Sequence, residues 1–152
     1  VLREAQGAGE PVAWVARPDS IFYPPDALRR GVDLEAVAVV RAGEGARAGE
    51  LLVRGGGFGL VIIDLAGRQR VSPPLLSRML GLAQKHETAA LFLTTSGRHE
   101  ASIDALISTR AWASMARVED GAFALRLTPL KDKRHAPDWA RREVCRGPAG
   151  LR

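Results

Sequence analysis

Four short runs of apolar residues recur along the first two thirds of the chain. They lie at residues 12–15, 37–40, 60–63 and 89–93. Each run is continuous rather than alternating with polar positions, which is typical of strands covered on both faces of a parallel sheet. The pattern therefore predicts four buried strands.

The segments between these runs carry helix signals. Residues 24–30 open with two prolines, which suit a first helical turn, and are followed by Gly31. Residues 44–54 give a weaker helical pattern that ends at three consecutive glycines. Strands that alternate with helices indicate βαβ units and a parallel sheet with helices on both faces.

The strongest helix signal lies at residues 75–86. Ser72 is placed to cap this helix, and Pro73 and Pro74 start its first turn. Its apolar positions recur at helical spacing and predict one buried face. They are Leu75, Leu76, Met79, Leu80, Leu82 and Ala83.

Beyond residue 110 the pattern changes. Two strand-like runs, at residues 115–118 and 123–127, flank an Asp-Gly pair, and another run lies at residues 142–145. Asp-Gly between strands signals a hairpin. We expect these strands to be antiparallel and to join one edge of the parallel sheet. The predicted fold class is α/β, a three-layer sandwich with C-terminal antiparallel strands.

Length and composition fit one globular domain. The chain has 152 residues, of which 46% are hydrophobic, and its one cysteine, Cys145, cannot form an internal disulfide. No apolar stretch approaches the roughly 20 residues of a membrane span, and residues 1–9 do not look like a signal peptide. We expect a soluble, cytoplasmic protein. Because the chain begins with Val1 rather than methionine, we expect it to be a fragment.

Positive charge is concentrated at the C-terminal end. The net charge is +5, and residues 126–152 hold eight Lys or Arg against three Asp or Glu, whereas residues 1–125 hold fourteen of each. Two interpretations stay open for the basic segment at residues 131–152. It either meets phosphates of nucleic acid or is a solvated tail.

Ligands of open α/β sheets bind beyond the carboxyl ends of the strands. The third apolar run ends in Asp64, an acid held at the edge of a dry sheet, which suits a magnesium-orienting site. The alternative is that Asp64 caps the following turn. Asp19 follows the first run, and Thr95 follows the fourth.

A nucleotide site also needs a glycine-rich phosphate cradle with a lysine between a strand and a helix. The glycines at residues 55–59 precede a strand instead of following one, and they include no lysine. They are typical of a helix stop and a tight turn. The three histidines, His86, His99 and His135, do not have the spacing of metal ligands.

From residue 11 onward the chain resembles the core of the RecA-like recombinase superfamily, downstream of its P-loop. The resemblance rests on residues 29–34, on Asp64 at the Walker B position, on residues 91–95 and on residues 125–133. It implies a RecA-like fold, with residues 1–9 as the end of a P-loop helix.

The chain departs from the family at the catalytic positions. Pro18 stands about where the family has its water-activating glutamate, Asp19 is a shifted substitute, and Thr95 replaces the sensor glutamine. We therefore expect no efficient ATP hydrolysis and no cofactor. ATP and magnesium enter only under the alternative that the chain is a truncated P-loop ATPase.

The resemblance also implies binding residues. Lys131 and Lys133 match lysines that reach across a subunit boundary in the recombinase, although they could equally be solvated lysines at a strand end. Both belong to one alternating strand, so both side chains should face the same side. The remaining candidates for nucleic-acid contact are arginines: Arg98, Arg110, Arg134, Arg141 and Arg142.

Within the superfamily the chain is most similar to the ImuA accessory proteins of bacterial SOS mutagenesis, and SulA-type division inhibitors are a smaller possibility. The resemblance implies a DNA-damage binding module whose partners are RecA, a mutasome polymerase subunit, DNA or a second copy. A receiver-like phosphoacceptor domain is a further alternative, because Asp64, Thr94 and Lys131 occur in the required order. Against it, Arg17 and Pro18 occupy the place of a receiver's acidic pair.

Overall fold

The chain forms two compact units. Unit 1 comprises Val1–Thr95 and unit 2 comprises Ser96–Arg152. The computed structural model describes residues 1–20, 22–65, 70–118, 121–136 and 138–146.

Unit 1 is built on a four-stranded parallel sheet with the strand order β2-β1-β3-β4. Its strands are β1 (Val12–Ala16), β2 (Val37–Arg41), β3 (Leu60–Asp64) and β4 (Ala89–Leu93), which confirms the four strands predicted from the apolar runs. The inner strands β1 and β3 are almost entirely buried, whereas the outer strands expose side chains such as Val39 and Leu93. The expectation of strands covered on both faces is thus correct only for the inner pair.

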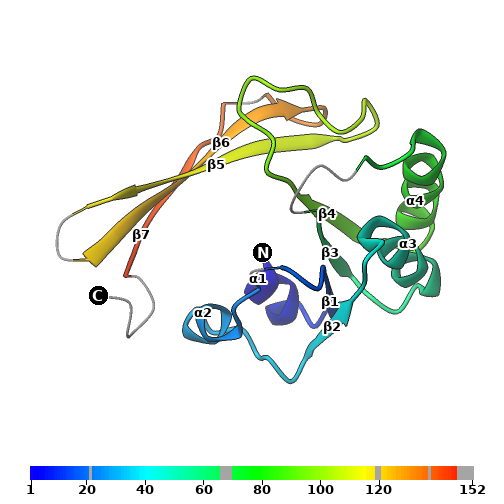
Figure 1. The fold of residues 1–152 in the computed structure, drawn as a ribbon, viewed down its shortest axis with the longest axis horizontal. Coiled ribbons are helices and arrows are strands. Elements are labelled where there is room, and N and C mark those ends of the chain that lie inside the picture. Colours follow the sequence, from blue (N-terminus) through cyan, green and yellow to red (C-terminus); the bar gives the residue numbers. More distant parts are fainter. Residues whose placement is uncertain (21, 66–69, 119–120, 137, 147–152) are drawn as a thin grey trace. The chain divides into compact units, whose positions relative to one another are not determined.

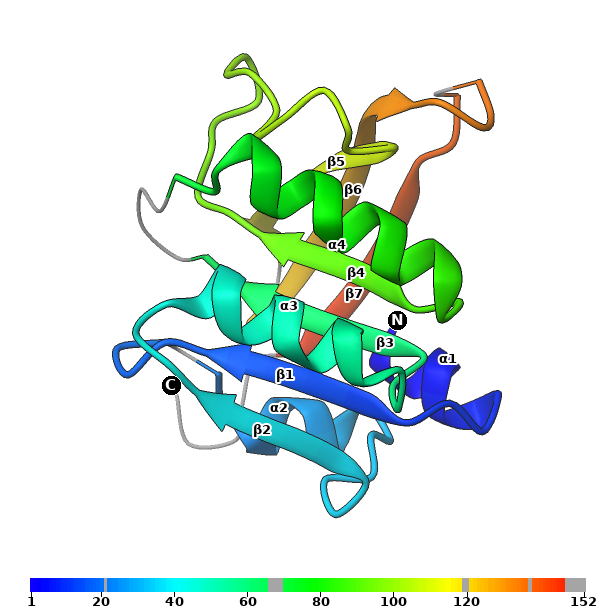
Figure 2. The same cartoon turned by 90° about the vertical axis from the view of Figure 1, so that its right-hand side faces the viewer.

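Helices cover both faces of this sheet, as Figures 1 and 2 show. Helices α1 (Leu2–Gly7) and α2 (Pro24–Arg29) lie on one face, and α3 (Gly45–Gly55) and α4 (Pro73–Lys85) lie on the other. Leu2 and Ala27 pack on a core cluster that contains Val12 and Ile62. On the opposite face, Gly49 lies so close to Ile63 that any Cβ at this position would collide with it. Unit 1 is therefore an α/β fold whose inner strands are buried between two helical layers.

The predicted helices are confirmed, with one wrong detail at α4. Ser72 occupies the N-cap position, but its side chain makes no capping hydrogen bond. Its backbone carbonyl instead accepts hydrogen bonds from the amides of Leu75 and Leu76. Two prolines in the first helical turn remove donors that a cap would otherwise satisfy, so the side-chain cap is dispensable. Leu76 is buried in the predicted apolar face, whereas Leu80 is exposed.

Unit 2 contains a three-stranded antiparallel sheet with the order β5-β6-β7. The strands are β5 (Thr109–Arg117), β6 (Ala122–Asp132) and β7 (Arg141–Arg146). The predicted hairpin is confirmed: β5 pairs with β6, and Gly121 at the turn has a φ of 70°. Its other turn residues, Glu119 and Asp120, lie outside the described residues.

The expectation that these strands extend the parallel sheet was wrong, because they form a separate sheet. β5 and β6 have 9 and 11 residues, about twice the 5 residues of each strand in unit 1. Long strands joined by a short turn satisfy their backbone groups with each other. They therefore need no partner from a parallel sheet.

The pairing of β5 with β6 contains a bulge. Ala111 pairs with Pro129 and Arg110 pairs with Lys131, so Leu130 is an extra residue on β6. Proline cannot donate a hydrogen bond to a sheet ladder and is found at bulges and unpaired edges. β7 pairs with β6 only as far as Leu127, so Pro129 lies beyond its reach.

No helix in the described ranges is both long enough and apolar enough to cross a membrane.

Candidate functional site

The strand order of unit 1 locates the place where a ligand is expected to bind. β1 lies between β2 and β3, and the chain leaves β1 toward β2 but leaves β3 toward β4. The connections after these two neighbours, α2 and α4, cover opposite faces of the sheet. A crevice beyond the carboxyl ends at such a reversal is the usual ligand site of an open α/β sheet.

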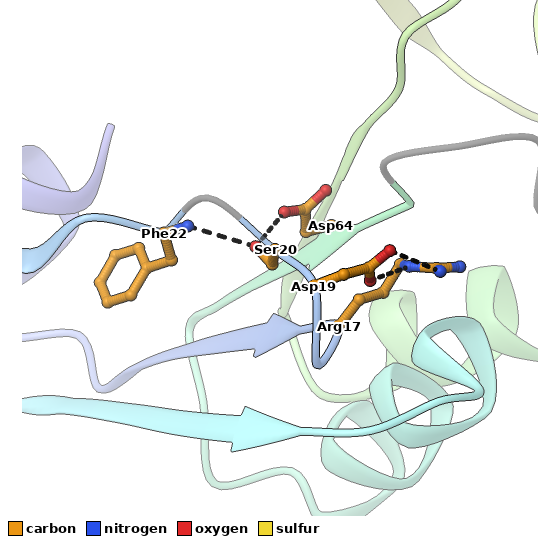
Figure 3. Close-up of polar contacts among 5 residues, drawn as sticks. All are labelled: Arg17, Asp19, Ser20, Phe22 and Asp64. Carbon is orange, nitrogen blue, oxygen red and sulfur yellow. Dashed lines mark hydrogen bonds and ion pairs between the residues drawn. The ribbon is translucent and has the colours of Figure 1, made fainter.

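Asp64 lies at this reversal, at the end of β3. Its side chain is buried and accepts a hydrogen bond of 2.5 Å from the hydroxyl of Ser20, which follows β1. The Ser20 oxygen also accepts a hydrogen bond from the amide of Phe22 (Figure 3). Ser20 thus connects Asp64 to the segment that leads into α2.

Asp19 is engaged elsewhere. Its carboxylate accepts hydrogen bonds from the guanidinium of Arg17, at 2.8 and 3.1 Å (Figure 3). The hydrogen bond from Arg17 lowers the pKa of Asp19 below its ordinary value, and the same bond raises the pKa of Arg17. Asp19 was expected beside Asp64 as a shifted catalytic acid. In the structure Asp19 binds Arg17, and a hydrogen bond to Asp64 comes from the neighbouring Ser20.

A cavity of about 430 Å³ opens at the same end of the sheet. Its lining comes from β1, the segment before α2, α2 itself, and the ends of β3 and β4. The lining residues are Trp14, Phe22, Tyr23, Asp26, Ala27, Asp64, Leu93, Thr94 and Thr95. The structure therefore brings two predicted site residues, Asp64 and Thr95, to one cavity.

Aromatic rings form much of this lining. The rings of Trp14 and Phe22 stack with their centroids 4.6 Å apart and their planes tilted by 35°. The indole N–H of Trp14 is buried and has no hydrogen-bond partner within the described part of the chain. Sequence reasoning missed these rings because Trp14 belongs to a strand predicted to be core. The aromatic spacing from Trp14 to Phe22 and Tyr23 across the end of β1 was the available signal.

The glycine-rich residues 55–59 lie at the other end of β3. Gly56 ends α3 in the left-handed conformation, with a φ of 65°. Gly59 donates a backbone hydrogen bond to Pro11 just before β3 begins. These residues are at the amino edge of the sheet, whereas Asp64 is at the carboxyl edge. The interpretation as a helix stop and turn is confirmed.

In unit 2, Lys131 and Lys133 reach the same acceptor. Their ammonium groups donate to the carbonyl oxygen of Ala105, at 3.1 and 2.7 Å. The prediction that both side chains face the same side is confirmed. The two lysines hold the segment that precedes β5 against the end of β6.

Two of the arginines predicted to contact nucleic acid also hold the segment that precedes β5. The Arg110 guanidinium donates to the carbonyl oxygens of Gly97 and Glu100. The Arg98 guanidinium lies 5.7 Å from the centroid of the Trp112 ring, a cation–π contact. Both arginines therefore have partners inside unit 2.

Asp132 organises the turn that follows β6. Its side chain is 6% exposed and accepts hydrogen bonds from the amides of Arg134 and His135 and from the indole of Trp139. The amide of Arg134 is the main cause of the lowered pKa of Asp132, and burial opposes it. The Arg134 side chain is exposed.

The strand register places three arginines on one face of the antiparallel sheet. Arg126 pairs with Arg142. Arg146 lies four residues further along β7, opposite Ala122, and because side chains alternate it faces the same side as Arg142. All three side chains are exposed. Arg141 pairs with Leu127, on the other face. Arg126 was missed because its partner on β7 follows only from the register.

Among the described residues, no group of three or more His, Cys, Asp or Glu side chains is placed to hold a metal ion. No protein-family model matches the chain, and no curated protein is significantly similar to it.

Proposed function

We propose that this chain is a binding module of DNA-damage metabolism that contacts nucleic acid through unit 2 and does not hydrolyse ATP. The proposal combines the resemblance to the RecA-like superfamily, and within it to ImuA, with the arginine face of unit 2. That face is formed by Arg126, Arg142 and Arg146. Its partners include RecA or a mutasome polymerase subunit.

The observation that carries the proposal is the direct pairing of Arg126 with Arg142. Like charges opposite each other on neighbouring strands destabilise a sheet. Within the described part of the chain neither arginine forms an ion pair. A phosphate backbone laid along this face would remove the repulsion and release counterions.

The surface beside these arginines is hollowed. A depression of about 430 Å³ is lined by small residues (Ser114, Ala116, Ala124 and Ala140), by Met115 and by three arginines: Arg126, Arg141 and Arg142. Ser114 pairs with Arg126, so the hollow follows the strands beside the charged pair. Small residues let a backbone approach while the long arginine side chains surround it.

The arrangement of unit 1 supports the lack of turnover. The acids nearest the expected hydrolytic site, Asp64 and Asp19, are bound to Ser20 and Arg17. The glycine-rich segment lies at the opposite end of β3 from Asp64. Calorimetric titration with magnesium-ATP should therefore show no micromolar affinity.

Nucleic-acid binding is tested with a labelled single-stranded oligonucleotide over a range of salt concentrations. Each lost phosphate contact should flatten the logarithmic salt dependence by about 0.7 on single strands. Arg126→Gln with Arg142→Gln should therefore flatten it by about 1.4. The matched control is Arg117→Gln, which removes one charge from the other face, where Arg117 pairs with Phe123.

Two outcomes would contradict the nucleic-acid proposal. One is that the unmodified chain does not bind the oligonucleotide at low salt. The other is that Arg117→Gln weakens binding as much as Arg126→Gln, because then only net charge matters.

The partner proposal is tested separately by retention of RecA and the polymerase subunit on the immobilised chain. Lys131→Glu with Lys133→Glu should abolish retention if these two lysines contact the partner, as the resemblance to the recombinase implies. Retention that survives both changes would exclude that surface.

A further inference from the structure

From the cavity of unit 1 we infer a second binding site, for an organic cation: an ammonium or guanidinium group carried on an apolar stem. The inference is independent of the proposed function, which rests on unit 2. The cavity volume of about 430 Å³ lies within the range of about 300–1,000 Å³ typical of small-molecule sites.

The aromatic lining is the first basis for this inference. Trp14, Phe22 and Tyr23 all line the cavity, and the first two are stacked against each other. Aromatic faces carry negative electrostatic potential and attract cations, and cages of such rings bind ammonium groups. Tyr23 is 53% exposed, so its ring is accessible to a ligand from solvent.

The charge of the lining is the second basis. Its two carboxylic acids are Asp26 and Asp64, and none of the described lining residues is Lys, Arg or His. A phosphate or carboxylate would meet like charge here, whereas a cation meets opposite charge. The rings and Leu93 supply apolar surface for the stem of the ligand.

The position of the two acids gives the site a direction. Asp64 is 6% exposed and is held by Ser20, so it forms the inner end of the cavity. Asp26 lies in the first turn of α2 and is exposed. We therefore assign Asp64 to the inner part of the site and Asp26 to its entrance.

The test follows the indole N–H resonance of Trp14 in the full chain, assigned with Trp14→Phe, while n-butylguanidinium is added. We expect a saturable shift in the millimolar range. The uncharged near-isostere n-butylurea should need at least about tenfold higher concentration, and inorganic phosphate should cause no saturable shift. Equal binding of n-butylurea and n-butylguanidinium would overturn the inference.

Variants separate charge and ring effects. Asp26→Asn should weaken n-butylguanidinium binding by about two- to fivefold, as for a solvent-exposed ion pair. Tyr23→Leu should weaken it by a similar two- to fivefold, as for an exposed cation–π contact. Glu35→Gln, an exposed position of unit 1 outside the cavity lining, is the matched control. An equal loss in Glu35→Gln would show that only net charge matters and would overturn the site.

The source of the cation is resolved with a capped Ala-Arg-Ala peptide. Binding at least about tenfold tighter than that of n-butylguanidinium assigns the cavity to an arginine side chain of a protein partner. Equal binding assigns it to a free amine or guanidine. Absence of binding by both n-butylguanidinium and the peptide would refute the inference.

Discussion

The two units of this chain are stabilised in different ways. Among the described residues of unit 1, 16 apolar residues between Val12 and Met79 are buried, and β3 is buried along its whole length. In unit 2 none of the described residues between Ser96 and Arg146 is fully buried. Its segments are held by strand pairing and by cationic side chains bonded to backbone carbonyls.

This difference in burial predicts a difference in stability between the two units. Burial of apolar area is the main stabilising term of folding, so unit 1 should be the more stable part. In unit 2 most residues of β5 and β7 are exposed and most of β6 are only half-buried, so its sheet should be the less stable part.

Truncation of a core side chain should separate the units most clearly. Ile63→Ala on β3 should lower the free energy of unfolding of unit 1 by about 2–5 kcal/mol, because it leaves a cavity in a packed sheet. Met115→Ala on β5, where the side chain is 64% exposed, should cost less than about 0.5 kcal/mol. Urea unfolding, with hydrogen exchange of the amides monitored separately for each unit, measures the costs of both substitutions. Similar costs would contradict the comparison.

Removal of a carbonyl-bound cation should act mainly on unit 2. Arg110→Met removes two hydrogen bonds, to Gly97 and Glu100, and should cost about 1–3 kcal/mol of local stability. The amides of residues 97–108 should then exchange faster, while those of β1 and β3 are unchanged. Arg117→Met, on an exposed part of the same strand, is the control.

Glu50, one of the buried acids of unit 1, gives a pH test. Burial alone would raise the pKa of Glu50, but the hydrogen bond and charge of Arg54, together with Arg78, outweigh it and lower the pKa. Glu50 is 4% exposed and links α3 to Arg78 of α4. A lowered pKa stabilises the fold above the ordinary value of 4.5, and this contribution is lost as the pH falls through the lower folded value.

Glu50→Gln should therefore cost about 1 kcal/mol at neutral pH, because charge-assisted bonds to half-exposed arginines are replaced by neutral ones. The cost should shrink toward pH 3. Thermal unfolding of both proteins between pH 3 and pH 7 measures it. A cost that is independent of pH would show that the charge of Glu50 contributes nothing.

The two lysines of unit 2 should give the smallest single effects. Because Lys131 and Lys133 share the carbonyl of Ala105, either one alone can satisfy it. Lys131→Met and Lys133→Met should each cost less than about 0.5 kcal/mol, and the double variant should cost more than their sum. Exchange of the amides around Ala105 measures the difference, and strict additivity would contradict the shared role.

The sequence predicted the strands and helices of unit 1 because burial imposes a readable pattern on them. Continuous apolar runs predicted β1 to β4, two prolines with a following glycine predicted α2, and two prolines with helical periodicity predicted α4. The Asp-Gly pair gave the hairpin of unit 2. What failed was the assignment of the late strands to an existing sheet, because the choice of partner depends on pairing energies that no local pattern encodes.

The candidate sites were predicted less completely. Asp64 was recognisable as an acid that ends a buried strand, but its hydrogen bond to Ser20 depends on the path of a loop. The rings of Trp14 and Phe22 meet only because β1 and the segment after it are adjacent in space. The pairing of Arg126 with Arg142 required the register of β6 with β7. Each of these is a tertiary relation between residues whose individual types are unremarkable.

The bulge at Leu130 has a consequence for how unit 2 avoids misfolding. A sheet without a fully buried face only weakly penalises a slipped pairing, and slipped or open edges promote aggregation. Because β6 carries one extra residue beside Pro129, its end beyond the bulge fits β5 in one alignment. Any slip along the hairpin would place this irregular stretch opposite regular strand and would move Lys131 away from the carbonyl of Ala105. The bulge therefore fixes the alignment of a sheet whose side chains alone would leave it poorly determined.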